Sequence, residues 1–229
     1  MRKGYGQFCP VAKAAEVFCE RWNALLFREL GAGSTRFSEI QRGVPLMSPS
    51  MLSRRLKELE GEGVVERCGS GNATSYHLTD AGREFLPVVE ALGIWGQRWT
   101  RRALREDEID FRLLLWDMER TIHGDAFGEG RTTVQLDFTD LPAERASWWF
   151  VNEGDVELCL QDPGYEVDLY LRVTVADMIH VWRGDVGVNR ALETERLQAH
   201  GPRRLVRKLR DWLGLSPPAS VKSAYPASF

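Results

Sequence analysis

The chain contains 229 residues with a mass of 26.1 kDa. This is enough for one large domain or for two domains of the ordinary size of about 100–150 residues. Hydrophobic residues make up 43% and charged residues 28% of the sequence, so the chain can bury a core beneath a solvated surface. This balance excludes collagen-like, low-complexity and wholly disordered classes. The uncharged stretches are too short for a membrane-spanning helix, so we expect no membrane partner.

Charge is divided unequally along the chain, although the formal net charge is only −3. Residues 1–105 contain 16 basic and 11 acidic residues, a net charge of +5, whereas residues 106–229 contain 14 basic and 22 acidic residues, a net charge of −8. The two halves therefore have different electrostatic roles. We place a domain boundary at residue 105, within the charge-dense segment 101–108.

The four cysteines, Cys9, Cys19, Cys68 and Cys159, are dispersed and form no pair at metal-ligand spacing. Neither a disulfide framework nor a bound metal or cofactor is therefore expected. Charged residues at positions 13, 16 and 20 interrupt the apolar stretch that a signal peptide needs. We expect an unprocessed cytoplasmic protein.

The beginning of the chain predicts two helices. Apolar residues recur at helical spacing from Val11 to Leu30, and Gly31 ends the pattern. A shorter amphipathic segment from Phe37 to Arg42 predicts the second helix, which Gly43 closes.

A third helix is predicted over residues 49–60, because Ser48 is a favourable N-cap and Pro49 is tolerated at the first helical position. At about 1.5 Å per residue the helix is roughly 18 Å long, sufficient to lie across a DNA major groove. Its two faces differ in character. One carries Leu52, Leu56 and Leu59, and the other carries Ser50, Ser53, Arg54 and Lys57.

A hairpin and a long helix complete the first half. Two short strands, Val64 to Arg67 and Thr74 to Thr79, are joined by a glycine-rich loop. Thr79 then caps a helix whose apolar pattern runs to Trp99. The order helix, helix, capped helix, hairpin is that of a winged helix–turn–helix. In that motif the capped helix enters the DNA groove and the hairpin reaches the backbone.

The first half contains a series of short motifs in a characteristic order. They are Cys9, Pro10, Trp22, Phe27 to Leu30, Arg36 to Ile40, Ser48, Pro49, Leu52 to Glu60, Gly63 to Arg67, Tyr76 to Thr79 and Gly82. With these motifs, residues 9–100 resemble the HxlR family of bacterial winged-helix transcription regulators. The resemblance implies a homodimer bound to a double-stranded DNA operator. The outer helices, here 11–30 and 80–104, would pair the subunits, and each capped helix would read one operator half-site.

Seven polar residues of this half are candidates for DNA contact. The cations suit phosphates and base edges, and the short serine side chains let a helix approach the bases. The charge of +5 fits several phosphate contacts, and we expect the acidic half to project away from the duplex. The candidates are Arg36, Ser48, Ser50, Ser53, Arg54, Lys57 and Arg67.

The second half predicts an α+β domain over residues 106–215, with a flexible tail over 216–229. Period-two alternation with turn residues between the runs predicts an antiparallel sheet, covered by helices on one face. The predicted elements are a helix from Asp110 to His123, four strands within 133–138, 147–151, 156–160 and 167–173, a helix that Thr174 caps, and a helix from Pro202 to Leu213.

The second half also contains a series of motifs, which are residues 155–158, 167–169, 174–178 and 181–185, followed by Leu205. In their order along the chain, these motifs weakly resemble those of the sterol-carrier-protein fold. The resemblance implies an apolar cavity between sheet and helices that holds a lipid-like or aromatic molecule.

Four residues are candidates for lining that cavity. Trp148 and Trp149 are consecutive on a strand, so at most one of them faces it. Met178 and Trp182 lie four positions apart on a helix and can close it. The alternative is that the tryptophans are ordinary core residues.

No nucleophile elbow, P-loop, metalloprotease motif or dinucleotide fingerprint is present, so no enzymatic activity is expected. Cys9 is a candidate redox or electrophile sensor, because a nearby helix start and Lys13 would lower the pKa of its thiol. Packing is the other role open to it.

Together these patterns predict a DNA-binding transcription regulator modulated by an apolar small molecule in residues 106–215. In one alternative the second domain is only an oligomerisation or protein-docking module, and in another Cys9 is the sensor. A further alternative is an enzyme or lipid carrier that contains a winged helix, which predicts turnover or transfer without DNA affinity.

Overall fold

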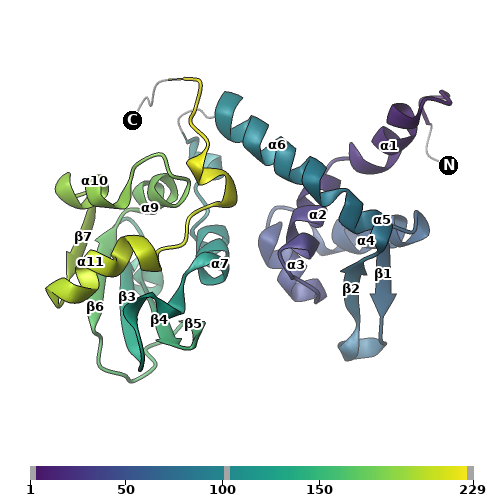
Figure 1. Cartoon of the computed structure of the whole chain (residues 1–229). Coiled ribbons are helices and arrows are strands. Elements are labelled where there is room, and N and C mark those ends of the chain that lie inside the picture. The colour runs from purple at the N-terminus through teal and green to yellow at the C-terminus, as the bar shows by residue number, and fades with distance from the viewer. Residues whose placement is uncertain (1–3, 101–103, 226–229) are drawn as a thin grey trace. The chain divides into compact units, whose positions relative to one another are not determined.

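The structure is a computed structural model that describes residues 4–100 and 104–225 (Figure 1). Contacts divide the chain into two compact units, residues 1–94 and 95–229, which we call unit 1 and unit 2. The division falls earlier than the boundary expected at residue 105, and positions 101–103 of the expected junction lie outside the described residues. No helix within the described ranges is long and apolar enough to cross a membrane.

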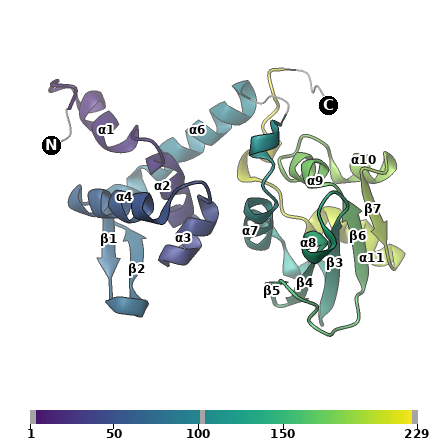
Figure 2. The same cartoon turned by 180° about the vertical axis from the view of Figure 1, so that it is seen from behind.

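Unit 1 is a set of helices with a two-stranded antiparallel hairpin, in the element order that the sequence predicts for a winged helix–turn–helix. Figure 2 shows α4 at the front of this unit with the hairpin beside it. The elements are α1 (Pro10–Phe18), α2 (Asn23–Gly31), α3 (Phe37–Gly43), α4 (Pro49–Gly61), β1 (Val65–Cys68), β2 (Ser75–Leu78), α5 (Asp80–Glu84) and α6 (Leu86–Trp99). The last five residues of α6, 95–99, fall in unit 2.

The single helix predicted over residues 11–30 is wrong, because the chain forms α1 and α2 with a break between them. Trp22 has a left-handed backbone with φ of 83°, which no α-helix contains. The buried side chain of Asn23 donates to the carbonyl of Val17 at 2.5 Å and so satisfies an orphan acceptor at the end of α1. The apolar spacing continues across the break, which is why periodicity alone missed it.

The helix predicted from residue 80 is also divided, into α5 and α6. Pro87 lies one residue inside α6, where it has no N–H to donate to the preceding turn. α6 ends at Trp99, where the predicted apolar pattern also ends. Of the outer helix 80–104 that the resemblance implies, residues 101–103 lie outside the described residues.

The core of unit 1 holds α3 and α4 in place. Leu52, Leu56 and Leu59 are fully buried on one side of α4, and Ile40 of α3 is buried in the same cluster. Ser48 caps α4 by accepting the backbone N–H of Met51 at 3.3 Å, as predicted. Burial of one leucine face therefore fixes which face of α4 remains in solvent.

Unit 2 is an α+β layer in which a five-stranded sheet, with strand order β5-β4-β3-β6-β7, has helices packed on one face. The inward-facing residues of β3, β4, β6 and β7 share one core with α7, α9, α10 and α11. The elements are α7 (Phe111–Thr121), β3 (Thr132–Phe138), α8 (Ala143–Ala146), β4 (Ser147–Glu153), β5 (Asp155–Cys159), β6 (Leu169–Val173), α9 (Val175–Trp182), α10 (Val188–Glu193), β7 (Leu197–His200) and α11 (Arg203–Trp212).

The sheet corrects the prediction of four antiparallel strands. β6 lies parallel to β3, and β7, which was not predicted, pairs antiparallel with β6 at the edge, so the sheet is mixed. The chain after β5 crosses over instead of forming another hairpin, and a crossover leads to parallel pairing.

The segment after residue 215 was expected to be loose but contacts the rest of unit 2. The backbone N–H of Ser216 donates to the carbonyl oxygen of Trp182 at 2.9 Å, and the backbone N–H of Ala224 donates to the carbonyl oxygen of Arg98 at 2.8 Å. A Cβ on Gly184 would lie 2.7 Å from the carbonyl oxygen of Ala219, so glycine permits this close approach. Residues 226–229 of the expected tail lie outside the described residues.

Candidate nucleic-acid interface

The solvent face of α4 carries Ser50, Ser53, Arg54 and Lys57, and all four are exposed. Their spacing of three, four and seven residues places them in one stripe along the helix. The Ser48 and Ser50 hydroxyls lie 3.2 Å apart, and Arg54 contacts Glu58 at 3.8 Å in a loose surface pair. An exposed pair at this distance contributes little stability, so Arg54 is available to an anionic partner.

The two other predicted cations meet at the hairpin. Arg36 donates from Nη1 to the carbonyl of Thr74 at 3.2 Å, and Arg67 lies 3.5 Å from the hydroxyl of the same residue. Both arginines are exposed. Thr74 directly follows the turn of the hairpin, so Arg36 and Arg67 lie near the turn end of the wing, as a pair of cations distinct from the α4 stripe.

Glu39 shapes the start of α3 beside Arg36. Its carboxylate accepts the backbone N–H groups of Thr35 and Arg36 at 2.8 and 2.9 Å. Burial raises the pKa of Glu39, but these two N–H donors outweigh burial and hold it below its ordinary value. The charged form of Glu39 is thus the one that fixes the helix start.

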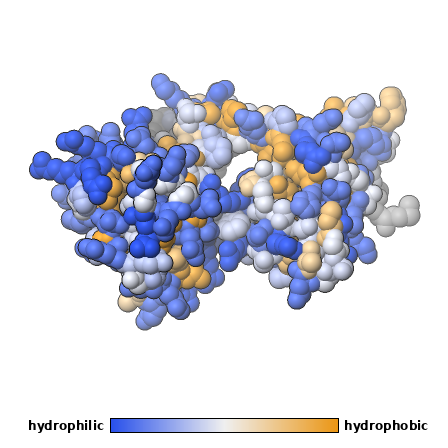
Figure 3. All heavy atoms as spheres, turned by 60° about the horizontal axis from the view of Figure 1, so that its bottom comes forward, coloured by the Kyte–Doolittle hydropathy of each residue, from blue (hydrophilic) through white to orange (hydrophobic). Residues whose placement is uncertain are grey.

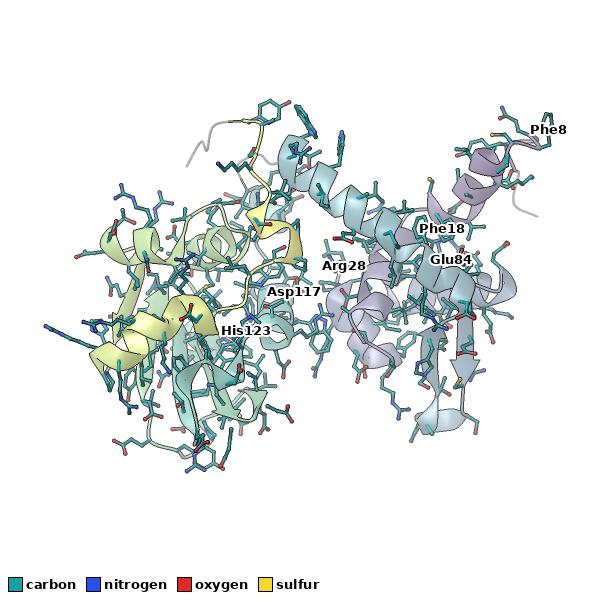
Figure 4. All side chains as sticks on the ribbon, viewed as in Figure 1. Phe8, Phe18, Arg28, Glu84, Asp117 and His123 are labelled. Atoms are coloured by element: carbon teal, nitrogen blue, oxygen red, sulfur yellow. The ribbon has the colours of Figure 1, made fainter. Side chains whose placement is uncertain are left out.

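A partly buried ion pair connects α2 to the end of α3. Glu29 is fully buried, and Nη2 of Arg28, which is labelled in Figure 4, lies 2.8 Å both from a Glu29 oxygen and from the carbonyl oxygen of Gly43. A Cβ at Gly43 would lie 1.9 Å from the Glu29 carboxyl carbon, so the contact requires glycine. We call Arg28, Glu29 and Gly43 the α2–α3 clamp.

The turn between α3 and α4 has its own donor. The amide nitrogen of Gln41 donates to the carbonyls of Val44 and Met47 at 3.2 and 2.6 Å. These bonds satisfy the backbone of a tight turn that positions α4.

Arg55 differs from its exposed neighbour on α4, because it is buried and pairs with Glu20 and Glu58, each at 2.8 Å. Arg55 is not among the residues that the sequence pattern predicts to contact DNA. Arg54 is therefore a surface cation, and Arg55 ties α4 to the segment between α1 and α2.

Unit 1 also has an open apolar groove with a cavity volume of about 370 Å³. Val88 and Leu92 on α6 and Val11 on α1 expose 47%, 52% and 76% of their surface, far more than core residues do. Stacked rings of Phe18 and Phe85, with centroids 3.6 Å apart, contribute to its lining. Figure 3 shows hydrophobic side chains reaching the surface of this unit. Periodicity predicted these apolar positions but cannot separate a core face from an interface.

Cys9 precedes α1 and is half-buried. Hydrogen bonds from the backbone N–H groups of Ala12 and Val11 hold the pKa of its thiol below the ordinary value. Cys159 in unit 2 differs, because burial, with Glu157 and Glu119 nearby, raises the pKa of its thiol.

The predicted pocket residues of unit 2 divide between the two sheet faces. Met178 is fully buried in the core, and Trp148 and Trp182 are half-buried against it. Trp182 donates from its indole nitrogen to the hydroxyl of Thr121 at 3.2 Å. Trp149 follows Trp148 on β4 and therefore points to the opposite face.

The capped α4, the turn before it and the hairpin after it define unit 1 as a winged helix–turn–helix domain. The family model described as HxlR-like helix-turn-helix matches residues 17–104. The HTH-type transcriptional regulator YvaP of Bacillus subtilis (strain 168) is 40% identical over 97 residues, which cover 90% of YvaP and 41% of this chain. The chain therefore belongs to the HxlR family of helix–turn–helix transcriptional regulators.

Other relatives match over a similar length. The HTH-type transcriptional regulator YodB of Bacillus subtilis (strain 168) is 34% identical over 95 residues, which cover 85% of YodB and 40% of this chain. Among solved structures, the redox regulator HypR in its oxidised form is 32% identical, with a TM-score of 0.38, and the match covers 42% of this chain and 100% of HypR. The matched family model ends at residue 104, before the helices and strands from α7 to α11.

Proposed function

We propose that this protein is a homodimeric transcription regulator that inserts α4 into the major groove of an operator half-site. The supporting observation is the exposed polar stripe of Ser50, Ser53, Arg54 and Lys57 on a helix whose opposite face is fully buried. Small hydroxyl side chains allow the helix to approach base edges, and a guanidinium can make a bidentate contact with guanine. In this proposal Arg36 and Arg67 contact the DNA phosphate backbone from the turn end of the wing.

The experiment begins with selection of bound duplexes from a random DNA pool, followed by gel-shift titration. Arg54→Ala is expected to weaken binding to the selected operator by roughly 1–3 kcal/mol, about 5- to 150-fold. Lys13→Ala removes another exposed cation, which pairs with Glu16 on the same helix, and serves as the matched control. Equal operator affinity of Arg54→Ala and wild type would exclude α4 as the reading helix.

The homodimer is proposed from the apolar groove. Its walls come from α1, α2 and α6, and exposed apolar side chains of this kind mark interaction surfaces. A second copy presents the same surface, and a twofold dimer brings two recognition helices to two half-sites.

Regulation by an apolar molecule in unit 2 is the remaining part of the proposal. It is supported by Trp148 and Trp182, which lie half-buried against the sheet-and-helix core. The ligand must bind the two dimer geometries with different affinities, and DNA must then change ligand affinity by the same factor. Native mass spectrometry of the purified protein tests this proposal, with a retained apolar molecule as the expected result.

A second candidate function is an electrophile response at Cys9, favoured by the lowered pKa of its thiol. The thiolate would add to the double bond of N-ethylmaleimide, forming a C–S bond while the carbanion takes a proton from water. Treatment is expected to change operator affinity in wild type and not in Cys9→Ser. An equal response of both proteins would exclude Cys9 as the sensor.

A further inference from the structure

The positive charge of residues 106–229 is concentrated on α11. This ten-residue helix holds five of the 14 basic residues found after position 105, in a half whose net charge is −8. Leu205, Leu209 and Trp212 are buried in the core and fix the helix orientation. We call the five basic residues of this helix the basic face of α11. Arg203, Arg204, Arg207 and Arg210 are exposed, and Lys208 is half-buried.

The basic face is not neutralised by its own chain. In the part of the chain that the structure describes, none of its five cations has a carboxylate within 4.0 Å. Other basic side chains of unit 2 do have such partners, for example Arg190 with Glu193 and Arg196 with Asp177. A run of unpaired arginines costs free energy through mutual repulsion, and an anionic partner relieves that cost.

The geometry of α11 suits a polyanion with closely spaced charges. From Arg203 to Arg210 the helix rises roughly 10 Å, at about 1.5 Å per residue. Duplex DNA carries about six phosphates over the same length, at one charge per roughly 1.7 Å of helix axis. Arginine also matches the geometry of a phosphate with two parallel N–H donors.

A lipid surface fits α11 less well. A helix that binds a bilayer interface needs an apolar face free to enter the acyl region. The apolar face of α11, with Leu205, Leu209 and Trp212, is already buried beneath the sheet and its helices. Only the charged face of α11 is left for a partner.

We propose that the basic face of α11 binds the phosphate backbone of duplex DNA as a second, sequence-independent contact of this regulator. The proposal rests on the proposed function, because DNA held by α4 raises the local concentration of phosphates around the tethered unit 2. It also modifies the expectation that the acidic half stays away from DNA. Without α11, residues 106–229 carry 9 basic and 21 acidic residues, a net charge of −12, so repulsion restricts the contact to this one helix.

The test is salt-dependent binding of the full-length protein to a random-sequence duplex, measured by fluorescence anisotropy. The variant carries Arg203→Gln, Arg204→Gln, Arg207→Gln and Arg210→Gln, which all lie in solvent. We expect about tenfold weaker binding at low salt. The slope of log K against log salt should become shallower by about 3 to 4 per protomer, close to 0.9 for each lost phosphate contact.

A matched control removes the same charge from dispersed positions of unit 2. It carries Arg145→Gln, Arg172→Gln, Arg190→Gln and Lys222→Gln, which are all exposed. The control should retain most of the wild-type slope, and circular dichroism should show equal folding of both variants. Equal slopes for the two variants would overturn the proposal, because charge alone and not the α11 face would then set the affinity.

Two further arms separate this proposal from its alternatives. Arg54→Ala is combined with each variant. If α4 does not read DNA, Arg54→Ala leaves DNA affinity unchanged while the slope change of the α11 variant persists. If Arg54→Ala weakens binding and the α11 variant keeps the wild-type slope, only the α11 contact is overturned.

Vesicles of phosphatidylserine and phosphatidylcholine form the second arm. Vesicle binding that is lost in the α11 variant, with an unchanged DNA slope, would assign the face to membranes and overturn the proposal.

Discussion

Glu29 lies fully buried, yet its charge is matched by Arg28, and the hydroxyl of Ser34 lies 3.3 Å from its second oxygen. The same guanidinium bonds the last residue of α3. Removing one partner of a buried pair costs much more than the pair itself contributes, because the other charge remains without compensation. The α2–α3 clamp therefore acts as a positioning device for the helices that precede α4.

Glu29→Ala is expected to destabilise unit 1 by about 1–3 kcal/mol, because it removes the ion pair to the partly exposed Arg28 and the acceptor of the buried Ser34 hydroxyl, and it leaves a cavity beside Gly43. Urea unfolding followed by circular dichroism measures the loss. Glu84→Ala on α5, an exposed position, is the control and should remain within about 0.5 kcal/mol of wild type (Figure 4). A similar loss in both variants would contradict the clamp.

Cys9 and Cys159 should react with iodoacetamide over different pH ranges. Only the thiolate reacts, and its fraction rises as the pH passes the pKa. Because the pKa of Cys9 is lowered and that of Cys159 is raised, alkylation of Cys9 should reach half of its maximal rate at the lower pH. Peptide mass spectrometry from about pH 5 to about pH 11 measures both profiles. Coincident profiles would argue against the effect of the Val11 and Ala12 N–H groups.

At the scale of elements, the helices and strands predicted most accurately from the sequence are those whose signals lie within the element itself. α4 was predicted nearly to the residue, because its Ser48 cap, Pro49 and leucine spacing all lie within the helix itself. β7 was missed because it has four residues and only alternate ones face the core. Its pairing with β6, like that of β6 with β3, depends on segments far apart in the chain. Such contacts leave no local pattern to read.

The candidate site divides in the same way. The α4 stripe follows from helical spacing, whereas Arg55, one residue from Arg54, is buried through ion pairs with residues of other turns and segments. The groove beside α6 escaped prediction for another reason. Apolar periodicity is identical for a helix that faces a core and for one that faces a second chain.

Leu92→Glu should disrupt the proposed homodimer, because it places a charge in the apolar groove that the partner must cover. Sedimentation equilibrium is expected to show a monomer at concentrations at which wild type is dimeric. The control is Leu46→Glu, which changes an apolar residue that is 78% exposed and does not line the groove. A dimer of unchanged strength in Leu92→Glu would exclude this surface as the interface.

At the scale of the whole molecule, the unequal charge that marks the sequence corresponds to two units with separate cores. One core contains residues from Val17 to Val89, and the other contains residues from Leu104 to Leu213. Among the described residues, none belongs to both cores. Net charge predicted the two-part organisation, but it averaged away the basic face of α11, which becomes apparent only when buried and exposed positions are separated.

Separate cores predict that the two units unfold in separate transitions. Leu56 belongs to the unit 1 core and Leu171 to the unit 2 core, and each is fully buried. Changing either to Ala removes buried methyl groups and leaves a cavity, at a cost of about 2–5 kcal/mol. Scanning calorimetry of the full chain should therefore show one transition moved by Leu56→Ala and the other moved by Leu171→Ala. A single transition that both variants lower equally would mean that the units fold as one cooperative body, because only then does a cavity in one core destabilise the other.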